Sequence, residues 1–92
     1  MMKKAVRIYV FGIVQGVFFR TFIKNQAKKL GIKGYVRNKN DGSVEIWLEG
    51  DGKKIEKMTE ICKKGPEHSV IKRLDIIEEH LQDFKEFKIM NF

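Results

Sequence analysis

The segment AVRIYVFG, residues 5–12, alternates between two sets of side chains. On an extended chain, one side carries Val6, Ile8 and Val10, and the other carries Arg7, Tyr9 and Phe11. A period of two predicts a strand with one buried face. The period then changes, because apolar residues recur at helical spacing from Phe19 to Leu30 and Gly31 supplies a stop signal. A strand followed by an amphipathic helix is therefore the expected opening unit of the fold.

The middle of the chain predicts a hairpin and a second helix. Residues 33–39 and 43–50 are strand-like runs on either side of Asn40-Asp41-Gly42, and Asp-Gly between alternating runs is a strong turn signal. In the later run the two alternating sets are Val44, Ile46 and Leu48 against Glu45, Trp47 and Glu49. Asp51 is a candidate cap for the second helix, whose apolar stripe contains Ile55, Met58, Ile61 and Cys62.

Two more strands complete the pattern, one over residues 70–77 and a short terminal one over residues 87–92. The order is β-α-β-β-α-β with a candidate fifth strand at an edge, which is a split βαβ arrangement. It predicts an α+β fold in which two helices cover one face of an antiparallel sheet. No repeat or linker-like stretch divides the chain, so residues 1–92 are expected to form one domain.

Composition limits the class of protein. The 92 residues contain 19 Lys plus Arg and 12 Asp plus Glu, a net charge of +7, which favours an anionic partner. No apolar run approaches the ~20 residues of a membrane span and none resembles a signal peptide, so we expect a cytoplasmic protein without a membrane partner. The single cysteine, Cys62, excludes an internal disulfide, and His68 and His80 offer no metal-ligand spacing.

The turn between the first strand and the first helix is the candidate anion site, and it runs Gly12-Ile13-Val14-Gln15-Gly16-Val17-Phe18-Phe19-Arg20. A tight turn into a helix start aims several N–H groups at one point, and the Arg20 guanidinium matches phosphate oxygens. The turn fits neither of the two common glycine-rich nucleotide motifs. Cys62 lies on an apolar helix stripe with no arginine-containing loop after it, which favours a core role over a cysteine-phosphatase nucleophile.

Three motifs follow one another along the chain: Val14-Gln15-Gly16-Val17-Phe18-Phe19-Arg20, Leu30-Gly31-Ile32-Lys33-Gly34-Tyr35-Val36-Arg37-Asn38, and Asp41-Gly42-Ser43-Val44-Glu45. Together with Gly65-Pro66 and Phe87-Lys88-Ile89, they resemble the acylphosphatase family over nearly the whole chain. The resemblance implies a small hydrolase with a ferredoxin-like split β-α-β sandwich, which splits acyl phosphates into carboxylate and phosphate. One departure is Ser69, where an alanine is more usual.

The resemblance also implies the site and its roles. The phosphate-binding loop would consist of Gln15, Gly16, Val17, Phe18, Phe19 and Arg20. Arg20 would hold the phosphate and Asn38 would position the attacking water, with no metal and no cofactor. This chemistry is reasonable, because the conjugate acid of a carboxylate leaving group has a pKa of about 4 and needs no proton from the enzyme. A neutral amide such as Asn38 orients water without acting as a base, although Asn is also an ordinary turn residue.

Two other classes of protein compete with this hypothesis. A four-stranded sheet with helices behind it is also the plan of a single-stranded RNA-binding module, whose open sheet face here would carry Tyr9, Phe11 and Trp47. Its signature motif begins at Lys33-Gly34-Tyr35 but does not continue. A domain serving a larger assembly is the third class. We expect a monomer acting on a small acyl phosphate, because two helices and one sheet face use the apolar residues.

Overall fold

Five strands and two helices follow one another in the computed structural model, which describes residues 2–90. They are β1 (Lys3–Ile13), α1 (Val17–Lys29), β2 (Lys33–Asn38), β3 (Val44–Asp51), α2 (Gly52–Lys64), β4 (Val70–Glu79) and β5 (Phe87–Met90). The predicted β-α-β-β-α-β order and the candidate fifth strand are both confirmed. The last two residues of the predicted terminal strand, 91 and 92, lie outside the described residues.

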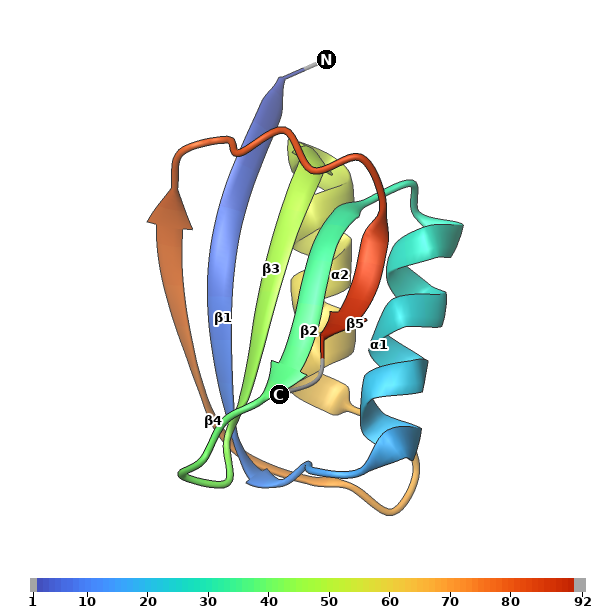
Figure 1. Ribbon diagram of the computed structural model, residues 1–92, viewed down its shortest axis with the longest axis vertical. Helices are drawn as coiled ribbons and strands as arrows, with labels where there is room; N and C mark the ends of the chain where they lie inside the picture. The colour runs from blue at the N-terminus through green and yellow to red at the C-terminus, as the bar shows by residue number, and fades with distance from the viewer. Residues whose placement is uncertain (1, 91–92) are drawn as a thin grey trace.

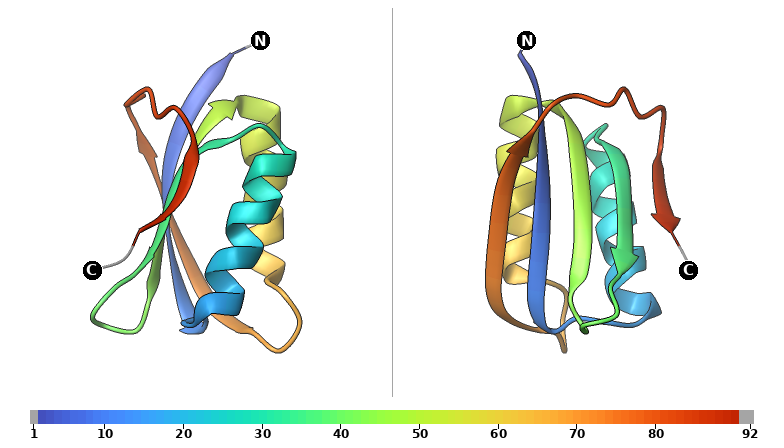
Figure 2. Two further views of the ribbon diagram at one scale, coloured as in Figure 1. Left: turned by 45° about the vertical axis from the view of Figure 1, so that its right-hand side comes forward. Right: turned by 60° about the vertical axis from the view of Figure 1, so that its left-hand side comes forward.

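The strands form one sheet in the order β4-β1-β3-β2-β5, with both helices on one face (Figures 1 and 2). The expectation of a wholly antiparallel sheet is wrong for one pair, since β5 runs parallel to β2 and Gly34 pairs with Phe87. The reason lies in the connection: β4 ends beside Ala5, at the end of the sheet where β2 begins. Residues 80–86 then cross to the other edge, so β5 starts alongside the start of β2.

The core lies between the sheet and the helices, as the two periods predict. From the strands it contains Val6, Ile8, Val10, Val36, Val44, Ile46 and Leu48. From the helices it contains Phe19, Ile23 and Ala27 of α1 and Ile55, Met58 and Cys62 of α2. The Cys62 side chain is fully buried there, which confirms its predicted core role.

Several boundaries differ from the predicted ones. α1 begins at Val17, two residues before the predicted start, because the turn at Gly16 already directs the chain into the helix. The apolar period could not mark this turn of helix, since Val17 and Phe18 are exposed. Asp51 does hold the N-cap position of α2, but its side chain makes no capping hydrogen bond. β4 continues two residues beyond the predicted Ile77, to Glu79.

The sheet face away from the helices is covered around Trp47, which corrects the open face of the RNA-binding hypothesis. Trp47 is only 4% exposed. Its ring stacks on Tyr35 at 6.2 Å between centroids and lies 6.0 Å from Phe84, which belongs to the segment crossing the sheet (Figure 2). The Glu49 carboxylate holds that segment by accepting the backbone N–H groups of Gln82 and Phe84. A base could not stack on this indole without displacing the segment.

Candidate active site

The turn between β1 and α1 gives the helix an open, positively polarised start. Gly16 is the N-cap, with φ 126°, a conformation that side-chain-bearing residues rarely adopt. The N–H of Arg20 is the first to bond within the helix, at 3.4 Å from the Gly16 carbonyl. The N–H groups of Val17, Phe18 and Phe19 precede it and have no acceptor inside the helix. No side chain of the described residues caps this end, which leaves a set of donors suited to an anion.

The path into this turn depends on a close backbone approach at Gly12. A register shift separates Phe11 from Gly12 in the pairing of β1 with β4. A Cβ on Gly12 would collide with the carbonyl oxygen of Val70, so only glycine fits. The shift ends the regular strand and redirects the chain toward α1.

Gln15 joins this turn to the hairpin between β2 and β3. Its side-chain amide donates to the carbonyl oxygens of Lys39 at 2.8 Å and Ser43 at 3.1 Å. The hairpin is itself fixed by Asp41, whose Oδ1 accepts the hydroxyl of Ser43 at 2.6 Å and its N–H at 2.9 Å. These hydrogen bonds lower the pKa of Asp41 below its usual value, so the carboxylate that fixes the hairpin stays ionised.

Asn38 is the last residue of β2 and stands beside that hairpin. It pairs with Val44 of β3 and is half-buried. Its Oδ1 is buried and accepts no hydrogen bond from any of residues 2–90. Buried amide oxygens in proteins normally accept a hydrogen bond, so this oxygen has acceptor capacity that the described residues leave unused.

The end of β2 and the start of α1 lie at the same end of the molecule (Figure 1). Arg20 is a half-buried residue of the first turn of α1, and Asn38 ends β2 directly before the hairpin that Gln15 contacts. The two residues to which the sequence assigned the chemistry are thus brought to one end from segments that lie far apart in the chain. No acidic residue of the described first turn of α1 opposes an anion there.

The predicted loop residues have different surroundings. Phe19 is buried in the core, Val17 and Phe18 are 60% and 86% exposed, and Gln15 faces the hairpin. For these residues, any contact with a phosphate is through backbone N–H groups. His68 and His80 are both exposed.

A network on the other sheet face, which sequence reasoning missed, supports β2 next to Asn38. Glu45 is 2% exposed and accepts the Tyr35 hydroxyl at 2.6 Å and Arg37 Nε at 2.7 Å. Burial alone would favour the neutral acid, but the hydrogen bonds from Tyr35 and Arg37 outweigh it and hold the pKa of Glu45 below its usual range. Burial and the bond to Glu45 raise the pKa of Tyr35. The alternation of β3 placed Glu45 on this face, yet it gave no sign of burial.

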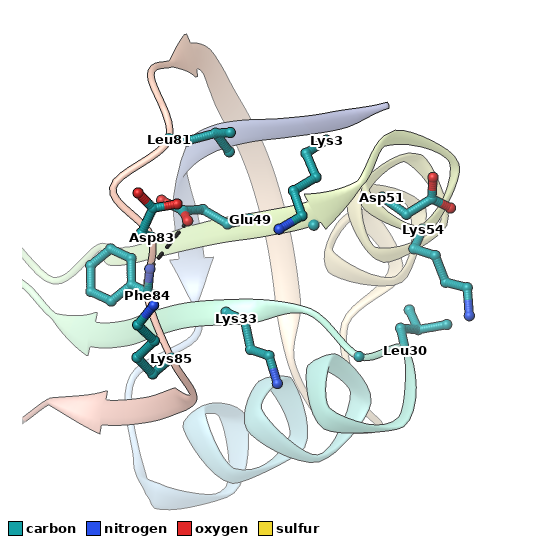
Figure 3. Close-up of a pocket in the computed structure, with 12 residues that line it drawn as sticks. Lys3, Leu30, Lys33, Glu49, Asp51, Lys54, Leu81, Asp83, Phe84 and Lys85 are labelled. Carbon is teal, nitrogen blue, oxygen red and sulfur yellow. Dashed lines mark hydrogen bonds between the residues drawn. The ribbon is translucent and has the colours of Figure 1, made fainter. Parts of the chain in front are cut away.

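Hollows lie at both ends of the sheet. At the Arg20 end, one of about 460 Å³ borders the β1–α1 turn, and one of about 440 Å³ is lined by Arg37, Asn38, Lys39, Asn40 and Asp41. At the opposite end, a hollow of about 310 Å³ has lysines and acidic residues side by side, and Glu49 there accepts the Phe84 N–H (Figure 3). The opposite hollow contains none of the predicted site residues.

Residues 2–90, the part of the chain that the structure describes, lack two features. No group of three or more His, Cys, Asp or Glu side chains could hold a metal ion. Neither helix has the length and apolar character that crossing a membrane requires.

Comparison with known proteins identifies the family. The fold is that of an α+β ferredoxin-like domain with two helices on an open mixed sheet. The family model described as acylphosphatase matches residues 6–89, and the chain therefore belongs to the acylphosphatase family. A curated acylphosphatase of Thermotoga maritima is 43% identical over 86 residues, covering 94% of this chain and 96% of the relative.

Solved structures agree with this assignment. An acylphosphatase from Bacillus subtilis superimposes with a TM-score of 0.92 at 35% identity, over 98% of this chain and all of its own. Full-length HypF, solved in a phosphate- and nucleotide-bound form, matches with a TM-score of 0.87 at 36% identity. The match spans 98% of this chain but 12% of HypF, so the same fold also occurs as a small part of a longer protein.

Proposed function

We propose that this enzyme of the acylphosphatase family hydrolyses the anhydride bond between a carboxyl group and a phosphate group, with Arg20 and the loop 14–20 binding the phosphate. One observation carries the proposal: the uncapped start of α1, Arg20 and the end of β2 at Asn38 lie at one end of the fold. Phosphoryl transfer needs mainly positioning and charge stabilisation, and backbone N–H donors with one guanidinium supply both.

In the proposed reaction the N–H groups of Val17, Phe18 and Phe19 and the Arg20 guanidinium hold the phosphate oxygens. The water oxygen forms a bond to phosphorus while the bond from phosphorus to the acyl oxygen breaks. The bonding pair leaves with the carboxylate, and both water protons end on the phosphate, giving RCOO⁻ and H2PO4⁻ from RCOOPO3²⁻ and water. The leaving carboxylate is a weak base, so no general acid is required.

Asn38 is assigned to the attacking water. Its buried Oδ1 has no donor among the described residues and would accept a hydrogen bond from one O–H of that water. This bond would aim a lone pair of the water oxygen at phosphorus. Gln15 is a positioning residue, because its two hydrogen bonds hold the phosphate loop against the hairpin that follows Asn38. The proposal keeps the sequence's further expectations: one domain over residues 1–92, a monomer, and a cytoplasmic enzyme without a metal or cofactor.

The proposal is tested by following phosphate release from benzoyl phosphate with the full chain and three variants. Arg20→Gln should remove activity and weaken competitive inhibition by inorganic phosphate, because the guanidinium is lost from the loop. Arg20→Lys should recover little, since a point charge does not reproduce the planar fork. Arg73→Gln is the matched control, an arginine of β4 that pairs with Asp75 on the surface and should behave as the parent. Full activity in Arg20→Gln would remove Arg20 from the site.

A further inference from the structure

A groove extends from the proposed phosphate loop toward the connection between α2 and β4. Its volume is about 460 Å³, within the ~300–1,000 Å³ of typical small-molecule sites. It is lined by Ile13, Val14, Gln15, Phe18 and Phe19 from the β1–α1 turn and by Pro66, Glu67, His68 and Ser69 from the α2–β4 connection. That connection runs beside the first turn of α1 in both figures (Figures 1 and 2).

The groove presents apolar surface where a surface loop ordinarily presents polar groups. Phe18 is 86% exposed and Ile13 is 65% exposed, and both lie on its lining. Large exposed apolar side chains gathered beside a binding site are a sign of a ligand that covers them. The backbone N–H of Phe18 belongs to the proposed phosphate cradle while its ring lines the groove, so a ligand anchored at the cradle has apolar surface within its immediate reach.

The connection that forms the far wall is held in place. The hydroxyl of Ser69 donates to the Pro66 carbonyl at 2.6 Å, and the Ser69 N–H donates to the same oxygen at 3.2 Å. An alanine at this position could make only the second bond. The turn from Pro66 to Ser69 is thus closed by two hydrogen bonds.

The charges of the groove differ from those of the molecule. The chain as a whole has a net charge of +7, yet the lining contains one acidic residue, Glu67, and neither lysine nor arginine. A second anionic group on a ligand would lie near the Glu67 carboxylate, and the lining holds no lysine or arginine to offset that charge. The lining therefore suits an uncharged, apolar group joined to an anion.

We propose that this groove is the acyl-binding site and that it selects acyl phosphates whose acyl part is uncharged and apolar, with aromatic groups favoured by the Phe18 ring and Pro66. The inference rests on the proposed function, since it needs the phosphate to be held at the start of α1. Phe18 and Ile13 provide the apolar contact, and Glu67 disfavours acyl groups that carry their own carboxylate.

The test compares kcat/KM for three substrates: benzoyl phosphate, acetyl phosphate and succinyl phosphate, whose acyl part ends in a carboxylate. In Phe18→Ala the ratio of benzoyl to acetyl phosphate should fall about tenfold, a typical effect of one lost apolar contact. Ile13→Thr should lower the same ratio by about threefold. Val70→Thr is its matched control, because Val70 pairs with Ile13 and is 45% exposed but does not line the groove.

Substrate ratios separate a lost acyl contact from a damaged phosphate loop, because damage to the loop lowers kcat/KM for all three substrates alike. Glu67→Gln should raise kcat/KM for succinyl phosphate about threefold relative to acetyl phosphate. If Phe18→Ala and Ile13→Thr both hydrolyse the substrates with the parent's ratio of benzoyl to acetyl phosphate, the groove is not the acyl-binding site. The proposed function would still stand. A folded parent enzyme that hydrolyses none of the three substrates would overturn the proposed function, and the groove assignment with it.

Discussion

The side-chain amide of Gln15 lies 2.8 Å from the carbonyl oxygen of Lys39, a residue 24 positions further along the chain. This hydrogen bond, with its companion to Ser43, links the phosphate loop to the hairpin that begins directly after Asn38. In the proposed reaction, the phosphate loop binds the phosphate and Asn38 binds the attacking water. The Gln15 side chain therefore connects the two segments that hold the reacting groups.

Gln15→Ala should lower kcat for benzoyl phosphate about tenfold, since a small displacement of loop against hairpin misaligns water and phosphorus. The free energy of unfolding should fall by about 1 kcal/mol or less, because Gln15 is an exposed residue. Gln82→Ala is the control, as its amide bonds to the His80 carbonyl, well away from the loop. Steady-state kinetics and urea unfolding check both; equal kcat in Gln15→Ala and the parent would contradict the positioning role.

Asn38→Ala should reduce kcat by about a hundredfold while KM changes by about twofold or less, because a water held only for the transition state contributes little to substrate binding. Asn40→Ala serves as the control, since Asn40 is an exposed residue of the adjacent turn. Initial rates over a range of benzoyl phosphate concentrations separate the two constants. A rise in KM that accounts for the whole loss of kcat/KM would place Asn38 against the substrate instead of the water.

The sequence predicted the features that depend on neighbours along the chain. The alternation of Val6, Ile8 and Val10 and the Asp41-Gly42 turn identified the strands and the hairpin, because each signal is complete within a few residues. The motif around Arg20 and the segment ending at Asn38 predicted the family, which the comparisons confirm. The roles of these two residues stay predictions.

What the sequence could not predict depends on contacts between distant residues. Trp47 was placed on the correct face but left open, since its ring is covered by Phe84, 37 positions further along the chain. Glu45 is bonded instead by Tyr35 and Arg37 of the neighbouring strand. The parallel pairing of β5 likewise follows from where the crossing segment enters the sheet. The bonds from Gln15 to Lys39 and Ser43 left no sequence signal, because a glutamine in a loop is ordinarily solvated.

Chelation should leave the activity unchanged. Residues 2–90 contain no group of three or more His, Cys, Asp or Glu side chains that could hold a metal ion. A carboxylate is also a good leaving group that needs no Lewis acid. Rates with benzoyl phosphate should agree before and after incubation with excess EDTA, and added Mg²⁺ or Zn²⁺ should not raise them. Inhibition by EDTA that a metal reverses would refute the metal-free scheme.

The Cys62 thiol should be inert in the folded protein. Burial raises its pKa to about 12, so almost no thiolate forms at mildly alkaline pH, and the side chain is inaccessible. Iodoacetamide should label the native chain at least about a hundredfold more slowly than the urea-unfolded chain. Thr21→Cys, which adds an exposed thiol on α1, is the positive control for native labelling. Rapid native labelling confined to Cys62 would contradict the packing of α2 on the sheet.

Glu45→Gln should destabilise the protein by about 2 kcal/mol at neutral pH, because the amide has no charge and keeps only one of the two oxygens that accept from Tyr35 and Arg37. The loss of stability stays small because the Arg37 side chain is 32% exposed and solvent screens its charge. Glu60→Gln, which disrupts only the exposed pair with Lys63, should cost about 0.5 kcal/mol or less.

The same variant defines a pH dependence. Because the pKa of Glu45 is lower in the folded state than in the unfolded state, its stabilisation is fully present above the unfolded value of about 4.3 and is lost as the pH falls through the folded value. Urea unfolding of the parent and Glu45→Gln should therefore differ most near neutral pH, and the two should converge as the solution is acidified below about pH 4. A difference that stays constant down to about pH 3 would mean that the Glu45 carboxylate is not stabilised by its partners, and the network on this face would have to be assigned to packing alone.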